Sequence, residues 1–473
     1  MLEASVKAMV ASRLGAIEAP AGTGKTEQIA RIAGYVRGRW LVLTHTIAGR
    51  DAIRRRLAKL DVSASKAQVD TIAAWTHRWA SAYPKASGLP VATATRADNW
   101  PAIHSAAARL AESGAVESIL AASYDGVLID EYQDCSTSQH ALARALSNHL
   151  RCYVFGDPYQ AIFQFSKEDT PVDWREVALS VFPLRGELNE PHRWNAANNQ
   201  ALGRWLLTSV RESISSGVLD LRSSPATVEW VKCTDDEPAS ALAKHCWMKG
   251  QNAGEVLAVI DSSTRVARRA ELAKRIQGTT IEPVAGACEI GFYSALASKE
   301  GIERVRAVLD LAGSGYVGLN AAQKLKRVDS ILARPGRLSK PPTEAELALC
   351  GVAQQSTWTT VLDALESIER EAGVRTVRPE LVSSVKATLR LASAEPSLDI
   401  EDACWKIANQ KRQKGRMVRN RSVGSTLLVK GLEFDYAVIT PQACTTRFEW
   451  YVALTRATRR VRVLAPDQVI HLD

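Results

Sequence analysis

Residues 19–26 read Ala-Pro-Ala-Gly-Thr-Gly-Lys-Thr. A short apolar stretch at 14–17 precedes this segment, and a helical pattern at 27–36 follows it. A strand, a glycine-rich turn and a helix are the context that a phosphate-binding P-loop requires. Glycines let backbone N–H groups turn inward around phosphates, and a helix N-terminus favours negative charge. The stretch therefore predicts a nucleotide site in an α/β fold.

The P-loop pattern assigns a task to each of its residues. We expect Lys25 to reach the β- and γ-phosphates of ATP and Thr26 to place its hydroxyl on Mg²⁺. The usual pattern begins with Gly, whereas Ala19 stands here. A chance glycine-rich turn is the alternative, which the strand–turn–helix context disfavours. The remaining cradle is predicted to come from Ala21, Gly22, Thr23 and Gly24.

A pair of carboxylates follows the apolar run Gly-Val-Leu-Ile at 126–129. Asp130 is expected to hold Mg²⁺, directly or through water, and Glu131 to orient and deprotonate the attacking water. Two solvated acids at a strand end are the alternative. With a P-loop in the same chain, the pair instead predicts ATP hydrolysis, and this prediction needs no family resemblance.

Apolar runs rich in β-branched residues predict the sheets. They occupy 40–44, 126–130, 152–156, 256–260 and 436–440, and they are typical of buried parallel strands. Helical patterns between them, as at 47–60, predict an α/β fold with helices on both sheet faces. Two mainly helical segments interrupt the alternation. The expected organisation is one α/β core from 1–75 and 121–185, a second from 186–315 and 418–473, and helical insertions at 76–120 and 316–417.

Composition restricts the class of protein. The formal net charge of +9 over 473 residues suits a polyanionic partner, although many basic proteins bind no nucleic acid. The eight cysteines contain no Cys-x-x-Cys pair, which argues against a zinc site or a disulfide framework and fits a reducing cytoplasm. We find no apolar run long enough to cross a bilayer and no signal peptide, so we expect a cytoplasmic chain without a membrane partner.

Several segments carry a resemblance to a known family. Asp-Glu-Tyr-Gln-Asp at 130–134, Gly-Asp-Pro-Tyr-Gln-Ala-Ile-Phe-Gln-Phe at 156–165, Lys-Gly-Leu-Glu-Phe at 430–434 and Tyr-Val-Ala-Leu-Thr-Arg-Ala at 451–457 follow in order. They resemble the second, third, fifth and sixth motifs of the UvrD/Rep/PcrA branch of superfamily 1 helicases. Glu-Pro-His-Arg at 190–193 resembles the fourth. The resemblance implies two RecA-like lobes, 1A and 2A, with short insertions 1B and 2B, and ATP-driven 3′-to-5′ movement on single-stranded DNA or a tailed duplex.

The same resemblance implies roles at the nucleotide. Gln160 would hydrogen-bond the γ-phosphate and report its loss. Arg456 and Arg193 would act as arginine fingers that neutralise charge on the transferred phosphoryl group. His192 takes the place of an adenine-stacking Tyr, and Glu433 would accept from a ribose hydroxyl. Taken alone, either arginine would more commonly form a surface salt bridge.

The resemblance also implies a DNA track. The hydroxyls of Thr44, Thr46 and Thr71 would grip phosphates without reading sequence. Phe163 and Phe165 would stack on bases, which suits a motor because every base has a π-face. Packing of these two aromatics in a core is the alternative.

Departures from the family pattern leave alternatives open. No Gln occurs among the 18 residues before Ala19, where the branch has an adenine-recognising Gln, although ATP is still expected. Ser-Thr-Leu-Leu at 425–428 replaces the usual Thr-x-His start of the fifth motif. Short helicases of this kind resemble the helicase-like subunit of the Gabija anti-phage system, which works beside a nuclease, but repair or mobile-element roles fit equally. A regulatory ATPase that controls a partner nuclease with little unwinding is the second hypothesis. An RNA motor is a third, which the Asp-Glu-x-Gln-Asp form disfavours.

Overall fold

A computed structural model describes residues 3–90, 99–163, 169–248, 252, 254–282, 287–334, 340–355, 357–412 and 418–472. The chain divides into two compact units. The first comprises Met1–Lys232, Lys430–Ala437 and Cys444–Asp473, and the second comprises Cys233–Val429 and Val438–Ala443. The four segment boundaries expected from the sequence stay a prediction.

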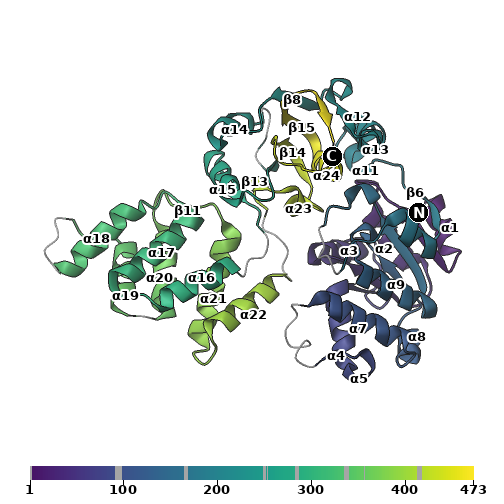
Figure 1. Ribbon diagram of the computed structural model, residues 1–473, viewed down its shortest axis with the longest axis horizontal. Helices are drawn as coiled ribbons and strands as arrows, with labels where there is room; N and C mark the ends of the chain where they lie inside the picture. The colour runs from purple at the N-terminus through teal and green to yellow at the C-terminus, as the bar shows by residue number, and fades with distance from the viewer. Residues whose placement is uncertain are drawn as a thin grey trace. The chain divides into compact units, whose positions relative to one another are not determined.

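The first six-stranded sheet lies in the first unit (Figure 1). Its strand order is β3-β2-β4-β5-β1-β6, and its described pairings are parallel. The strands are β1 (Leu14–Glu18), β2 (Trp40–Thr44), β3 (Ala67–Thr71), β4 (Gly126–Ile129), β5 (Arg151–Gly156) and β6 (Leu184–Glu187). Because the strands are parallel, their carboxyl ends meet at one edge of the sheet.

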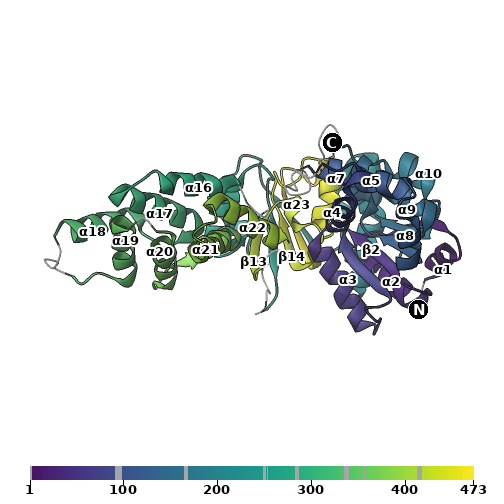
Figure 2. The same ribbon diagram turned by 90° about the horizontal axis from the view of Figure 1, so that it is seen from below.

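Helices cover both faces of this sheet, as a parallel sheet requires. Side chains alternate along β2, so that Leu41 and Leu43 join one apolar core while Trp40 and Val42 join the other. Figure 2 shows α7 and α9 on the opposite side of β2 from α2 and α3. The covering helices are α1 (Ala4–Val10), α2 (Lys25–Tyr35) and α3 (Ile47–Lys59) on one face, and α4 (Ile72–Ala82), α7 (Trp100–Glu112), α8 (Glu117–Ser123) and α9 (Thr137–His149) on the other.

The first unit also contains several short helices and strands. They are α5 (Pro84–Ser87), α10 (Leu179–Val181), α11 (His192–Ala196), α12 (Gln200–Trp205), α13 (Arg211–Ser216), α24 (Arg447–Leu454), β7 (Val218–Asp220) and β16 (Val469–His471). The last two strands pair with each other in antiparallel fashion. Single-turn 3₁₀ helices occur at Tyr132–Asp134, Pro158–Gln160 and Leu221–Ser223, and π-helical turns at Trp174–Ala178 and Leu206–Val210.

A second six-stranded sheet has the order β10-β13-β9-β14-β15-β8. Its described pairings are parallel. The strands are β8 (Val228–Lys232), β9 (Leu257–Ile260), β10 (Thr279–Thr280), β13 (Arg421–Gly424), β14 (Phe434–Ile439) and β15 (Ala457–Ala465), and α14 (Ala239–His245), α15 (Val266–Arg275) and α23 (Thr426–Val429) are interspersed with them. The predicted α/β class, with two RecA-like parallel sheets flanked by helices, is therefore confirmed.

The second unit contains a helical body, in which α16 to α22 gather together (Figures 1 and 2). Its apolar core includes Val305, Val308, Leu349, Leu365 and Leu389, all with little or no exposed surface. Its elements are α16 (Ala287–Ala297), α17 (Gly301–Gly315), β11 (Tyr316–Val317), α18 (Ala321–Ala333), α19 (Glu344–Gln354), α20 (Trp358–Arg370), β12 (Arg375–Thr376), α21 (Pro379–Ala394) and α22 (Ile400–Arg412). Within the described ranges, no helix has both the length and the apolar character needed to span a membrane.

Candidate nucleotide site

The predicted nucleotide residues lie at the carboxyl edge of the first sheet. The P-loop follows β1, Asp130 and Glu131 follow β4, and Gln160 lies a few residues after β5. Strands β4, β5 and β1 are neighbours in that order, so their carboxyl ends meet. Ligands bind outside the carboxyl ends of the strands in open α/β sheets.

The P-loop turn depends on two glycines with left-handed backbone. Gly22 has φ 72° and Gly24 has φ 86°, a backbone region that residues other than glycine rarely adopt. A Cβ on Gly22 would lie 2.6 Å from the Trp194 ring, and one on Gly24 would lie 3.1 Å from the His192 ring. The predicted residues Ala21 to Gly24 form this turn, and Lys25 begins α2 with Thr26 beside it.

Lys25 lies between the two acids that follow β4. Its Nζ is 3.0 Å from Asp130 Oδ1, and it also forms an ion pair with Glu131. Burial lowers the pKa of Lys25, but the charges of Asp130 and Glu131 outweigh burial and raise it, so the ammonium stays charged. Burial would raise the pKa of Glu131, yet Lys25 and Lys430 lower it to about 2. The Glu131 carboxylate is therefore ionised at neutral pH.

The backbone and neighbours of Glu131 aim its carboxylate. Glu131 has φ 55°, a conformation that is strained for a residue with a side chain and that commonly occurs at functional sites. Its N–H donates to Asp130 Oδ1 at 2.9 Å. Gln133 Nε2 donates to Glu131 Oε2 at 2.6 Å, while Gln133 Oε1 accepts from the Asp157 N–H at 3.0 Å. One glutamine thus connects the end of β4 with the end of β5.

Gln160 and Arg456 contact each other directly. Arg456 NH2 donates to Gln160 Oε1 at 3.2 Å and to Thr455 Oγ1 at 2.8 Å. Its Nε donates to the Val452 carbonyl at 2.8 Å, and the side chain is almost completely buried. Burial, assisted by the charge of Arg193, lowers the pKa of Arg456 to about 10, so the guanidinium keeps its charge at neutral pH.

Arg193 joins the P-loop to the segments that resemble the fifth and sixth motifs. Its backbone N–H donates to the Gly22 carbonyl at 3.1 Å. Its NH1 donates to the Thr455 carbonyl at 2.9 Å, and its NH2 donates to Glu433 Oε1 at 2.6 Å. In the described part of the chain, Arg193 Nε is a buried donor without a hydrogen-bond partner. A spare donor beside a glycine cradle fits an anionic group such as a nucleotide phosphate.

The residues predicted for the base and ribose lie beside the P-loop. The His192 side chain is 54% exposed, and its Nε2 is 3.7 Å from Glu3 Oε1. Glu3 in turn accepts from Gln28 Nε2 at 3.2 Å, and its N–H donates to Gln28 Oε1 at 3.3 Å. The Glu433 side chain is 57% exposed, and its described partner is Arg193. The adenine-stacking and ribose roles stay predictions.

Three further residues belong to this arrangement, and sequence reasoning assigned them no role. Lys430 Nζ donates to both oxygens of Asp134, at 2.6 and 2.5 Å, and to the Gln160 carbonyl at 2.6 Å. Burial raises the pKa of Asp134 to about 7, although Lys430 opposes that rise. Asp157 is a buried carboxylate between the P-loop and Gln160. All three stand in the segments quoted for the resemblance, which was the available signal.

The predicted track residues lie at the same edge of the sheet. Thr44 is buried at the end of β2. The Thr46 hydroxyl caps α3 by accepting from the Gly49 N–H at 3.0 Å, and the Thr71 hydroxyl caps α4 by accepting from the Ala74 N–H at 3.1 Å. Both capping hydroxyls keep an O–H that can donate.

Of the two predicted base-stacking aromatics, Phe163 belongs to the described residues. Phe163 lies 4.7 Å from Lys430 Nζ, measured to the ring centroid, which is a cation–π distance. Phe165 lies outside the described residues. The DNA contacts stay predictions.

One segment of the chain matches a model of a known protein family. Residues 95–171 match the family model described as the UvrD/REP helicase N-terminal domain. The chain resembles the UvrD-like helicases of superfamily 1. The matched segment contains Asp130, Glu131 and Gln160, so the resemblance drawn from the motifs is confirmed there. No curated protein matches the chain.

Solved helicase structures show weak likenesses. The Pif1 helicase from Candida albicans is 12% identical with a TM-score of 0.44, and the match covers 99% of this chain and 96% of that one. The arterivirus nonstructural protein 10 helicase is 11% identical in a complex with DNA and 12% without it, both with a TM-score of 0.36. Those matches cover 98% of this chain but only 63% and 61% of the arterivirus chains. At these TM-scores the likenesses carry no argument about activity.

Proposed function

We propose that this chain is an ATP-driven DNA helicase or translocase of the UvrD-like type that moves 3′ to 5′ on single-stranded DNA. The hydrogen bond between Arg456 and Gln160, 3.2 Å long, is the observation that supports the proposal most. It joins the end of α24 to the segment after β5, and Asp157 connects the same glutamine to Ala21 of the P-loop. A motor needs such a contact, because a change at the nucleotide must be transmitted to other parts of the chain.

Each side chain then has a chemical task. Ala21 to Gly24 form the turn around the phosphates, the ammonium of Lys25 binds them, and Thr26 and Asp130 hold Mg²⁺. Bound magnesium supplies positive charge that offsets the charge of the phosphates. Glu131, ionised and aimed by Gln133, orients the attacking water and accepts its proton.

The remaining predicted residues act on the transferred group, the base and the track. Gln160 senses the γ-phosphate, while Arg456 and Arg193 neutralise charge that develops during transfer. His192 stacks on adenine, and Glu433 accepts from the ribose. The proposed contacts to single-stranded DNA are Thr44, Thr46, Thr71, Phe163 and Phe165.

ATP turnover by Arg456 variants tests the proposal. Arg456→Lys keeps a charge but not the planar fork, and Arg456→Ala removes both. With single-stranded DNA present, we expect both to lower ATP turnover by about a thousandfold, the scale of a lost arginine finger. Arg459→Ala is the matched control, since Arg459 pairs with Asp435 and is half exposed, and its turnover should equal that of the unmodified chain. Full turnover by Arg456→Lys and Arg456→Ala would contradict the proposal.

Stimulation of ATP turnover by DNA or by RNA distinguishes the proposed DNA motor from the alternative functions. A DNA motor is stimulated more by single-stranded DNA than by RNA, and the reverse result would favour an RNA motor. DNA-stimulated ATPase without strand separation by the purified chain would favour a regulatory ATPase that controls a partner nuclease. Roles in anti-phage defence or repair, a nuclease partner and a cytoplasmic location stay predictions from the resemblance and the composition.

A further inference from the structure

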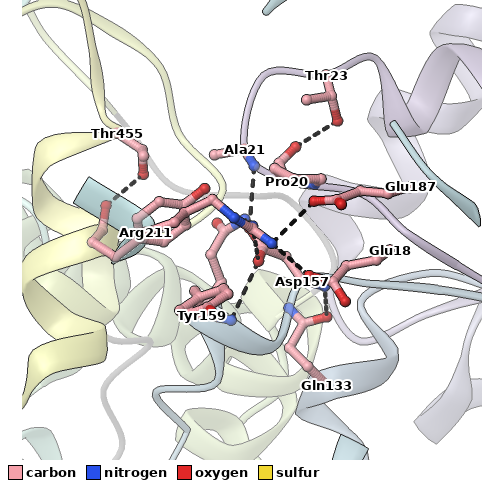
Figure 3. Close-up of polar contacts among 12 residues, drawn as sticks. Glu18, Pro20, Ala21, Thr23, Gln133, Asp157, Tyr159, Glu187, Arg211 and Thr455 are labelled. Carbon is pink, nitrogen blue, oxygen red and sulfur yellow. Dashed lines mark hydrogen bonds and ion pairs between the residues drawn. The ribbon is translucent and has the colours of Figure 1, made fainter. Parts of the chain in front are cut away.

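Asp157 is a completely buried carboxylate that accepts four hydrogen bonds. Its Oδ2 accepts from the Ala21 N–H at 3.1 Å and from Gln160 Nε2 at 2.7 Å. Its Oδ1 accepts from the Tyr159 N–H at 3.2 Å and from Arg211 NH1 at 3.2 Å (Figure 3). The same carboxylate therefore holds the P-loop turn and the side chain of Gln160.

Arg211 is the cation that makes this burial possible. It is the first residue of α13, and its side chain is 11% exposed. Besides Asp157, its NH2 donates to Glu18 at 2.5 Å and to Glu187 at 3.1 Å, and its guanidinium lies 4.4 Å from the Tyr159 ring centroid. Figure 3 shows the guanidinium directed toward all three carboxylates. The planar guanidinium has enough N–H donors to contact several carboxylates, and a buried carboxylate without a cation is strongly unfavourable.

The Asp157 contact also sets which way the Gln160 amide faces. An ionised carboxylate only accepts hydrogen bonds, so Gln160 turns its Nε2 toward Asp157. Its Oε1 is then presented to Arg456, 3.2 Å away. A flipped amide would set an NH₂ group against the Arg456 guanidinium, and both groups are donors.

We propose that Arg211 is a positioning residue for the nucleotide site, which acts through Asp157 to hold the P-loop turn and the orientation of Gln160. The inference rests on the proposed ATPase, because it assigns Gln160 to the γ-phosphate. Arg211 needs no contact with the nucleotide itself. Its removal changes the site by releasing Asp157.

The charges around Asp157 predict how activity should depend on pH when Arg211 is replaced. Burial raises the pKa of Asp157, Arg211 is the largest charge that opposes the rise, Glu18 adds to it, and Lys25 also opposes it. Neighbours of this cluster also include Glu187, which binds Arg211, the Tyr159 ring under the guanidinium, and Tyr451 on α24.

Without Arg211 the pKa of Asp157 rises further, so the carboxyl takes up a proton as the pH falls. A protonated carboxyl accepts fewer hydrogen bonds, which frees Gln160 to turn. A variant without Arg211 therefore loses more activity toward low pH than the unmodified chain does.

The experiment compares Arg211→Met and Arg211→Gln with Asp157→Asn in the full chain. Measurements are kcat and KM for ATP from pH 6 to 9, titration with fluorescent ADP, and thermal melting to confirm folding at the assay temperature. Arg462→Met is the matched control, because Arg462 also has a mostly buried ion-paired side chain, 12% exposed and bound to Glu229.

We expect Arg211→Met to lower kcat about tenfold at pH 7.5 and further toward pH 6, with a weaker effect at pH 9. Asp157→Asn should lower kcat by a similar factor at every pH, because its amide imitates the protonated carboxyl. The double variant should be no worse than the single ones. Arg462→Met should keep the kcat and the pH profile of the unmodified chain.

A folded Arg211→Met chain with unmodified kcat and pH profile would overturn the inference, even if its melting temperature were lower. If Arg211→Met does not fold, Arg211→Gln, which also removes the charge, decides by the same profile. Absence of ATP turnover in the unmodified chain would instead refute the proposed function. The ADP titration still tests the Arg211 link to the P-loop in that case, with weakened ADP binding by the variants as the supporting result and equal binding as the contrary one.

Discussion

Replacement of Glu131 by Gln separates chemistry from binding at the proposed site. The substitution keeps the size of the side chain and lets Gln133 still donate to an oxygen at that position, 2.6 Å away in the unmodified chain. It removes the base that accepts a proton from water. We expect ATP turnover to fall by a hundredfold or more, the usual range for a lost general base, while fluorescent ADP and single-stranded DNA bind as before.

The same substitution should lower stability by an amount that the pKa of Glu131 sets. Ion pairing depresses this pKa from 4.5 to about 2. At 1.36 kcal/mol per unit, the shift corresponds to about 3 kcal/mol, which we reduce to about 2 kcal/mol because the side chain is 29% exposed. A depressed carboxylate pKa stabilises the fold above the unfolded-state pKa, and the effect is lost as the pH falls through the folded-state value. The stability difference should therefore be complete above pH 5 and disappear toward pH 2.

Two assays with one control decide this prediction. ATP turnover is measured with saturating single-stranded DNA, and the free energy of unfolding comes from urea titrations at pH 7.5 and pH 3. Glu229→Gln is the control, since Glu229 is half exposed and forms an ion pair with Arg462 on β15. Unchanged turnover in Glu131→Gln would remove Glu131 from the proposed role. A stability loss that is equal at both pH values would refute the ion-pair reasoning.

Three other substitutions probe separate parts of the account. Gly22→Ala places a Cβ 2.6 Å from the Trp194 ring at φ 72°, so it should lower the free energy of unfolding by about 1–3 kcal/mol and weaken fluorescent ADP binding; normal ADP binding would contradict the role of this turn. His104 is buried, and burial lowers its pKa to about 4. The unfolded chain therefore binds an extra proton between pH 4 and 6.5, so the free energy of unfolding falls by about 3 kcal/mol as the pH drops through that window. His104→Gln should flatten this pH dependence in urea titrations, and an unchanged slope would contradict it. Phe163→Ala should weaken single-stranded DNA binding about tenfold in an anisotropy titration if the ring stacks on a base, whereas unchanged affinity would favour packing alone.

The inner strands β2, β4, β5, β9 and β14 were predictable because they form continuous apolar runs, whereas the inner strands β13 and β15 carry charged and polar residues and were not predicted. The apolar runs predicted at 40–44 and 126–130 correspond to β2 at Trp40–Thr44 and β4 at Gly126–Ile129. The edge strands β6 and β8 escaped notice because edges face solvent and carry mixed residues. An edge strand has no continuous apolar run from which it can be predicted.

Some residues of the site could be predicted from local sequence patterns, and others could not. Lys25 and Glu131 stand in short local patterns whose chemistry the neighbouring residues specify. Arg211 depends on partners that are 54 residues away at Asp157 and 193 residues away at Glu18. No local pattern marks such a residue, since its task is defined only when the chain folds. The exposed setting of His192 and the pairing of Glu3 with Gln28 likewise depend on the fold.

Single-turnover unwinding of tailed duplexes tests the central claim most directly. The purified chain is bound to a duplex with a 3′ single-stranded tail or a 5′ tail, and ATP is added together with a trap for free protein. We predict strand separation of the 3′-tailed duplex that requires ATP and is lost in Glu131→Gln. Separation of only the 5′-tailed duplex would contradict the proposed direction, and absence of both separation and DNA-stimulated ATP turnover would contradict the motor itself.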